Sequence, residues 1–458
     1  MRSVDDHGDE RPGDARLGET RPGVASTGPP PRVTTGAIRW SRRHLFRGPL
    51  DTLLTITIAG GVGYLVWLFY VWGIDTAVWD AASRRECLDR SPTGACWAGV
   101  ISWFDRYLYG RYPDIEIWRV DLALAIFVLW MAPLWLPKVR AKVGVAMGVV
   151  LLYPFWAVAL FHGGERSLFL QVMMSAAITG FVLTLVHTVT CMVLGRGYWT
   201  VIIAMAGQLT VPEKARIFLV IAGMAVLWLA IFWLSVGWTV PEVNTYKWGG
   251  LFLTLVVSGI AIATALPAGI ILALGRRSRM PLIRALCIGY IEVVRSVPLV
   301  TLMFMATTMF PVMMPQGVTL DKLALAIISV CMFAAAYMAE TVRGGIQAIP
   351  FGQTEAAQAM GLRYWHAMGL IILPQALRAM IPNIVGSFIS LFKGTAVISI
   401  FGFYDLTNML SAVSQSPRWI MLFYEPLFVG ASMYFIGCFA MSRYSLYLER
   451  KLGVGGRH

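Results

Sequence analysis

The sequence predicts an all-α fold, a polytopic membrane bundle of about ten spanning helices. Apolar residue types make up 57% of the 458 residues and charged types only 14%, a composition far from that of a soluble domain. Long apolar runs recur along the chain, and a spanning helix needs about 20 such residues because its backbone must be satisfied within the segment. Basic residues gather beside these runs, where they set orientation and do not indicate nucleic acid binding.

Ten segments are long and apolar enough to be interpreted as spans. In chain order they are 53–72, 120–136, 143–161, 168–194, 217–238, 249–274, 282–310, 323–344, 376–400 and 420–441. The first is expected to be retained, because it is too long and too aromatic for a cleaved signal segment.

Charge bias predicts that both termini lie in the cytoplasm. Three basic groups then fall on that side: Arg39, Arg42, Arg43 and Arg47; Lys138, Arg140 and Lys142; Arg276, Arg277 and Arg279. Ten spans return the carboxyl terminus, with Arg450, Lys451 and Arg457, to the same side. The external segment 73–119 also holds arginines, and long loops follow the rule less strictly.

The spans divide the chain into a sequence of regions. We expect a disordered cytoplasmic tail over 1–48, a membrane extension of about five spans over 49–247, a five-span unit over 248–448 and a cytoplasmic tail over 449–458. Residues 198–209 form an amphipathic stretch that suits the membrane interface. Cys87 and Cys96 lie in the external segment, where an oxidising periplasm would allow a disulfide; two unpaired cysteines are the alternative.

The polar interval 347–374 predicts a short helix, a sharp bend and a second short helix. Pro350 closes the preceding span, and Gln353 and Thr354 offer a helix start that puts Glu355 in the first turn, near the positive end of the helix dipole. Gly361 can adopt the left-handed conformation that ends a helix. Tyr364 then begins the next helix. Small side chains at Ala356 and Ala357 would let a partner surface approach the first short helix closely. The simpler alternative is that this helix packs only on its own bundle.

The same interval reads EAAQAMGLRYWHAMGLIILP, with Glu355-Ala356-Ala357, then Gly361, Ile371 and Leu373-Pro374. This spacing resembles the EAA loop of bacterial ABC importer permeases. The flanking stretches 249–255, 292–299, 339–346 and 350–353 are similar to signatures of the polar amino acid subgroup. Over 248–448 the chain resembles the larger permease of general L-amino acid importers, in the His/Glu/Gln/Arg/opine-type permease family.

This resemblance implies an inner membrane permease that moves L-amino acids by alternating access. It implies a second permease in a heterodimer, a two-copy ATPase that uses ATP and Mg, and a periplasmic amino acid binding protein, with no cofactor on this chain. The interval 347–374 would contact the ATPase. Two departures stand out. The family usually has an acidic residue and then Thr-Ser after the membrane lysine, where this chain reads Lys393-Gly394-Thr395-Ala396, and 168–238 adds about two spans.

Charged residues within or beside spans are costly and are therefore candidate functional residues. Glu292 with Arg295, and Glu340 with Arg343, are each three positions apart, so each pair can meet on a helix. They would either tie helix ends to the polar interval or line a path or gate for amino acids. Lys393 lies inside a predicted span and is a further candidate for the substrate path.

The sequence also excludes functions. It contains no Gly-Lys dipeptide, so a P-loop is absent and a partner must hydrolyse ATP. It offers no metal-binding Cys/His spacing and no nucleophile elbow, so we expect neither a metal site nor a catalytic residue. A secondary ion-coupled transporter is the alternative, and Glu292 and Glu340 are the carboxylates that it would use.

Overall fold

The structure is a computed structural model that describes residues 45–136, 139, 142–164, 167–194, 213–236, 240–318 and 320–453. Several predictions concern residues outside this set: almost all of the tail 1–48, the basic residues Lys138, Arg140 and Arg457, and the stretch 198–209. The chain divides into two compact units, Met1–Val71 and Trp72–His458, which are described separately.

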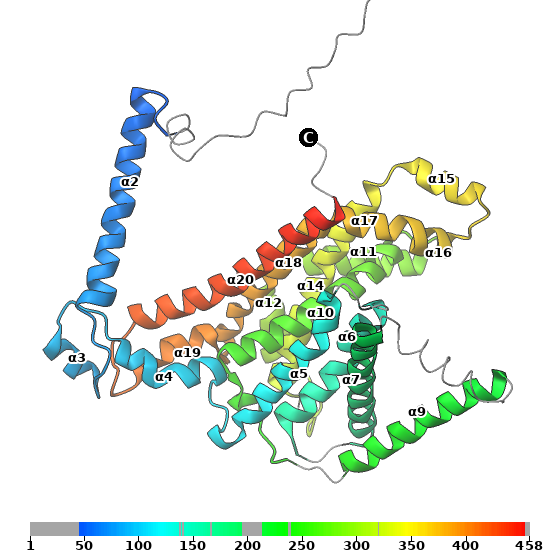
Figure 1. The fold of residues 1–458 in the computed structure, drawn as a ribbon, viewed down its shortest axis with the longest axis horizontal. Coiled ribbons are helices and arrows are strands. Elements are labelled where there is room, and N and C mark those ends of the chain that lie inside the picture. Colours follow the sequence, from blue (N-terminus) through cyan, green and yellow to red (C-terminus); the bar gives the residue numbers. More distant parts are fainter. Residues whose placement is uncertain are drawn as a thin grey trace, which may run out of the picture. The chain divides into compact units, whose positions relative to one another are not determined.

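The first unit contains α2 (Pro49–Tyr70), which begins with proline at the first helical position and has no buried residue (Figure 1). A π-helical turn over Val71–Asp75 follows it along the chain. Together they form an apolar helix of 27 residues, long enough to span a membrane.

The described residues of the second unit are mainly helical, and they include the two-residue strand β1 (Tyr404–Asp405) and isolated bridges. Its longer helices are α5 (Ile117–Trp135), α6 (Lys142–His162), α7 (Leu168–Leu194), α9 (Glu213–Val236), α10 (Gly250–Arg276), α11 (Pro281–Ser296), α14 (Lys322–Gln347), α18 (Ile381–Gly394) and α20 (Tyr424–Leu452). The shorter ones are α3 (Arg84–Arg90), α4 (Trp97–Tyr109), α12 (Leu299–Phe304), α13 (Phe310–Val312), α15 (Phe351–Ala359), α16 (Tyr364–Ala367), α17 (Leu373–Ala379) and α19 (Leu406–Ala412).

Eight of the ten predicted spans match helices that are long and apolar enough to cross a membrane, counted over the described residues. The fifth, 217–238, corresponds to α9, whose described apolar stretch Ala222–Ser235 is shorter than a full span. The last begins at Tyr424 and reaches Leu452, so it extends into the segment expected as a tail from residue 449. Gly453, with a φ of 65°, ends it.

The seventh predicted span, 282–310, was wrong as one continuous helix. It breaks between α11 and α12, and the two parts meet at 105°. Val297 has extended dihedrals (φ −104°, ψ 133°) because Pro298 disfavours the helical conformation in the residue before it. The axis of α11 is therefore turned sharply away from that of α12.

The two halves of the chain share one hydrophobic core. Helices α10 and α14 lie side by side (Figure 1). The aromatic side chains of Tyr112, Phe161, Trp248 and Phe252 pack together at the start of α10. The ring centroids of Phe161 and Phe252 are 4.7 Å apart. The helices α5, α6 and α7 therefore pack in the same core as α10, a role that the sequence alone left open.

A buried arginine strengthens this junction. Arg119 on α5 has no exposed surface, forms an ion pair with Glu116 and donates hydrogen bonds to the carbonyls of Leu160 and Pro241. Because a buried guanidinium is costly unless it is paired and hydrogen-bonded, these contacts hold α5 to the end of α6 and to the chain entering α10.

Residues 72–112 form a layer, called the cap here, over residues 404–425. A disulfide joins Cys87 to Cys96, with Cα atoms 5.9 Å apart. Trp97 and Cys96 pack with Trp419 and Leu422 in a second hydrophobic cluster. Gly99 permits this contact, since a Cβ there would lie 2.4 Å from Leu422 Cδ2.

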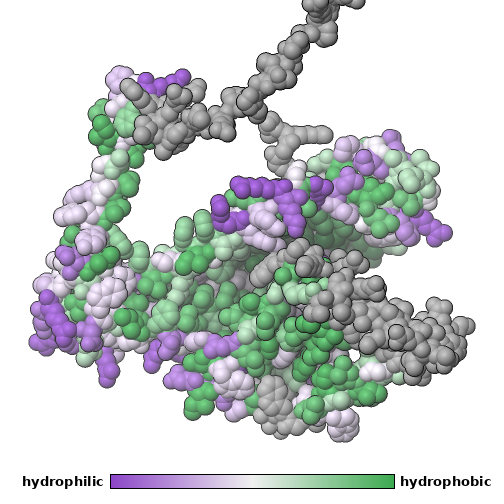
Figure 2. All heavy atoms as spheres, in the orientation of Figure 1, coloured by the Kyte–Doolittle hydropathy of each residue, from purple (hydrophilic) through white to green (hydrophobic). Residues whose placement is uncertain are grey.

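Hydrophobic side chains cover the flanks of the spanning helices in the second unit, and hydrophilic ones gather over α3 and over the carboxyl end of α20 (Figure 2). Many large apolar residues of these helices are exposed, for example Leu234 and Ile271. Such exposure is expected of helices that face lipid, because the bilayer core is as apolar as the side chains.

Candidate functional site

The polar interval after α14 folds as a helix, a bend and a helix, the shape predicted for it. Pro350, with extended dihedrals, precedes α15, which begins at Phe351. The helix therefore starts two residues earlier than predicted. No acidic residue falls in its first turn, so the placement of Glu355 there was wrong. Proline supplies the start because its φ suits the position before a helix and it needs no hydrogen-bond acceptor.

Gly361 ends α15 in a Schellman motif. Its N–H donates to the carbonyl of Gln358 (2.9 Å), and the N–H of Leu362 donates to that of Ala357 (3.1 Å). Gly361 has a φ of +75°, and no heavy atom lies within 4 Å of where a Cβ would sit. The bend thus depends on backbone conformation and not on a crowded contact.

The bend carries a surface of exposed apolar side chains, which sequence reasoning missed. Phe351 is 73% exposed, Met360 78% and Trp365 69%. Large apolar residues within a polar interval are the signal that could have revealed it, because such patches usually mark interaction sites. Of the small residues, Ala356 is exposed beside Glu355, while Ala357 is buried within the chain.

The chain that leads back from the bend to the bundle, residues 364–376, is called the return leg here. It is anchored on the bundle. Ile372 and Ala376 are buried against Val342 and Ile346 of α14, with Ile371 and Leu373 packed around them. A Cβ on Gly345 would lie 2.9 Å from the Ala376 carbonyl oxygen, so α14 and α17 touch closely. The loop is therefore fixed to α14 at both its beginning and its end.

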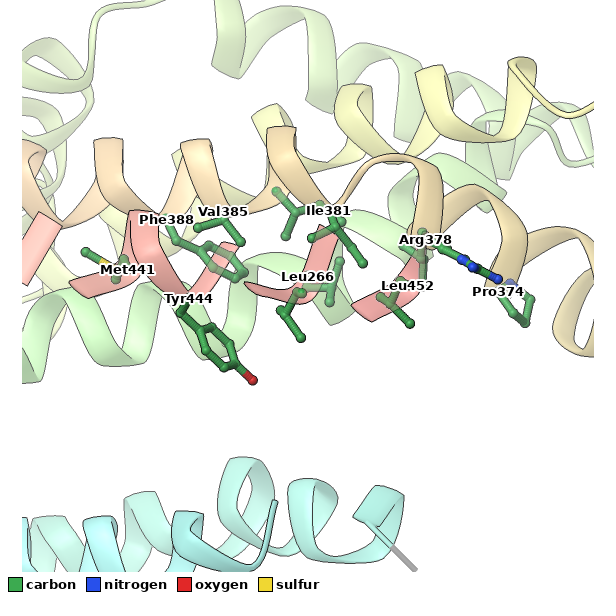
Figure 3. A pocket seen from close by; sticks show the side chains of 12 residues that line it. Leu266, Pro374, Arg378, Ile381, Val385, Phe388, Met441, Tyr444 and Leu452 are labelled. Atoms are coloured by element: carbon green, nitrogen blue, oxygen red, sulfur yellow. The ribbon is translucent and has the colours of Figure 1, made fainter. Parts of the chain in front are cut away.

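Pro374 lies at the mouth of an apolar groove of about 620 Å³ between α10, α17, α18 and α20. Figure 3 shows Arg378 beside Pro374 at one end, and Phe388 and Met441 at the other. The groove leaves the return leg in contact with the bundle on the α14 side and open on the α20 side.

Near the same end of the bundle, five charged side chains meet. Glu340 accepts from Arg276 (2.8 Å) and forms an ion pair with Arg343 (2.6 Å), while Arg276 also donates to Glu292 (3.0 Å). Arg295 reaches Glu340 at 3.8 Å. We call these five residues the charge cluster. It joins the ends of α10, α11 and α14.

One predicted pair within the cluster was wrong. Glu292 pairs with Arg276, and Arg295 turns toward Glu340 and the ring of Tyr337 instead of toward Glu292. The other predicted pair, Glu340 with Arg343, is present. Arg276 was not recognised as a site residue because its partners lie 16 and 64 positions away along the chain.

Lys393 lies outside this arrangement. It is exposed near the end of α18, and within the described part of the chain it takes part in no ion pair. Nor does that part hold three His, Cys, Asp or Glu residues grouped to bind a metal.

The chain is similar to known membrane transport proteins. The family described as "Binding-protein-dependent transport system inner membrane component" matches residues 265–454. The glutamate/glutamine/aspartate/asparagine transport system permease protein BztC of Rhodobacter capsulatus is 39% identical over 93% of this chain and 95% of its own. The inner membrane amino-acid ABC transporter permease protein YhdY of Escherichia coli is 35% identical over 93% and 97%.

Both of these relatives match along nearly the whole chain, so the match includes the extension as well as the five-span unit. A solved amino acid ABC transporter with histidines is 29% identical and covers 44% of this chain and 92% of its own, with a TM-score of 0.41.

Proposed function

The chain belongs to the family of inner membrane permease subunits of amino acid ABC importers, and from this premise we propose how it is coupled to ATP. It is a multi-pass membrane protein that takes part in ATP-driven import of amino acids. Residues 350–374, named the coupling loop here, would receive the movement of a partner ATPase and pass it to the spans. The supporting observation is the loop itself: an exposed bend that is anchored at both ends on α14.

The proposed contact surface combines polar and apolar groups. Glu355 and Ala356 are exposed on α15, and Met360 and Trp365 flank Gly361. The apolar side chains would fill a hollow on the ATPase while Glu355 meets a basic group, since a buried apolar anchor with a polar rim is typical of stable interfaces. Ile371, Leu373 and Pro374 would make the return leg a rigid lever.

We propose the complete assembly from the family. A second permease would form a heterodimer with this chain, two copies of the ATPase would bind ATP and Mg, and a binding protein would deliver the substrate. This chain would bind no cofactor and perform no hydrolysis itself, because it has no P-loop. Both termini and the coupling loop would then lie in the cytoplasm, as the basic loops indicate.

The proposed substrates are L-amino acids with acidic or amide side chains. The name of the relative that is 39% identical gives glutamate, glutamine, aspartate and asparagine. Lys393, an exposed cation on the spanning helix α18, is the candidate contact for a substrate carboxylate.

Reconstitution in proteoliposomes tests this function. The chain, its partner permease, the ATPase and the binding protein should take up labelled glutamate or glutamine only with ATP inside. A protonophore should leave uptake unchanged while ATP is held constant. Uptake that collapses with the proton gradient, or that proceeds without the ATPase, would contradict the proposal and favour ion-coupled transport.

A further inference from the structure

We infer that Arg276 is a positioning residue, which makes the broken helix α11–α12 follow the coupling loop during transport. This inference rests on the proposed function and adds a residue that transmits the movement. Arg276 is the last residue of α10, and one of its nitrogens, Nη1, donates to Glu292 of α11 and Glu340 of α14. A single guanidinium thus joins three helices.

The coupling loop, α14 and α10 pack together at this end. Glu340 lies two turns before the end of α14, and Arg343 donates to Gln347, the last residue of that helix. Buried residues of the loop, such as Ile372, pack on α14 in the cluster that also contains Ala273 of α10. A displacement of the loop therefore moves α14 and the end of α10 together.

The helix α11 contacts α10 and α14 through few buried side chains. Among its residues only Ile291 and Val294 are buried. Its other contacts with α10 and α14 include the close approach of Cys287 to Gly275, a hydrogen bond from the Tyr290 hydroxyl to the Met332 carbonyl (2.9 Å), and the polar contacts of Glu292 with Arg276 and of Arg295 with Glu340. Because α11 leads into α12 through the bend at Pro298, the link at Glu292 would help α12 to follow the loop.

The side chain that bridges the helices is partly shielded from solvent. Arg276 is 25% exposed, Glu340 14% and Glu292 57%. A single nitrogen of Arg276 makes the contacts with both Glu292 and Glu340. A lysine at position 276 has one ammonium nitrogen with three N–H donors, so it can replace part of the bridge. Glutamine is shorter and carries no charge, so it forms no ion pair with either carboxylate.

The test measures amino acids imported per ATP hydrolysed by the complete transporter in proteoliposomes. Arg276→Gln should lower this ratio at least about twofold, within the range by which single residues change coupling between sites. The KM for ATP should stay unchanged, because the ATP site belongs to the partner. Arg276→Lys should recover part of the ratio. A purely structural defect would instead lower uptake and hydrolysis together, in proportion to the assembled complex.

Arg277→Gln is the matched control, since Arg277 is the next residue, is exposed and forms no ion pair among the described residues. It should leave the ratio unchanged. If Arg276→Gln fails to assemble, Glu292→Gln removes only the α11 contact of an exposed side chain and should lower the ratio in the same way. The inference is overturned if an assembled Arg276→Gln or Glu292→Gln complex keeps the normal ratio, or if Arg277→Gln lowers it equally. Absence of ATP-dependent uptake in the unaltered complex would instead contradict the proposed function.

Discussion

Gly361 shows how one residue shapes the coupling loop. Its φ of +75° lies in the left-handed region, and open space surrounds the position of a Cβ. A larger side chain would therefore meet backbone strain and no steric clash. The strain falls on the residue that turns α15 toward α16, so any relaxation would redirect the exposed side chains on both sides.

We expect Gly361→Val to leave the protein inserted but to weaken ATPase binding roughly tenfold, because a left-handed conformation costs a residue with a Cβ about 1–2 kcal/mol. Uptake should fall with it, and co-purification of the ATPase measures the effect. Gly352→Val is the control, since Gly352 lies in α15, also faces open space and has no positive φ. Equal ATPase binding by the two variants would contradict the role of the bend.

Asp405 provides a second prediction for a single residue. Its side chain is fully buried and caps α19 by accepting from the N–H groups of Thr407 (3.2 Å) and Asn408 (3.1 Å). Burial raises its pKa from 3.8 to about 6, against these hydrogen bonds. The folded protein therefore holds a proton that the unfolded chain releases, and stability falls as the pH rises from about 4 to about 6.

Asp405→Asn should remove this dependence, because asparagine is also a good helix cap and carries no charge. Above pH 6 the variant should be more stable than the original by on the order of 3 kcal/mol, a difference that disappears below pH 4. Thermal unfolding of the purified protein across this pH range measures it. A difference that stayed constant with pH would show that folding does not shift the pKa of Asp405.

At the scale of elements, the cap shows how short helices become fixed to a spanning helix. Glu425, in the first turn of α20, is 2% exposed. Its Oε1 accepts from the backbone N–H of Cys96 (2.8 Å) and contacts Arg84 (3.5 Å). The disulfide between Cys87 and Cys96 links α3, which carries Arg84, to the segment that contains Cys96. The cap therefore depends on a carboxylate 329 positions away in the sequence.

Replacing Glu425 with alanine should destabilise the cap by about 1–3 kcal/mol, since the buried Cys96 N–H would lose its acceptor. Hydrogen exchange of residues 84–100 should speed up while that of α14 stays unchanged. Asp89→Ala, at an exposed position on α3, is the control and should change stability by less than about 0.5 kcal/mol. Similar exchange in the two variants would show that Glu425 does not hold the cap.

For the molecule as a whole, much of the fold could be predicted from composition and the length of apolar runs. Eight of the ten spans match helices because lipid forces each apolar segment to satisfy its own backbone. The bend at Pro298 was missed, although its cause is local, because the apolar run continues across the proline. The exposed side chains around Gly361 were missed because apolar residues in a short interval between spans do not by themselves show whether they pack inward or face outward.

The sequence by itself determined the membrane class, the helix–bend–helix shape of the coupling loop and the absence of a P-loop. Each of these depends on residues that are adjacent or nearly so. Only the tertiary structure decided which charges pair at Arg276, how α5, α6 and α7 join the core and what holds the cap. Those contacts join residues far apart along the chain, and several partners of suitable charge compete for each. Packing between helices, which no local pattern encodes, selects among them.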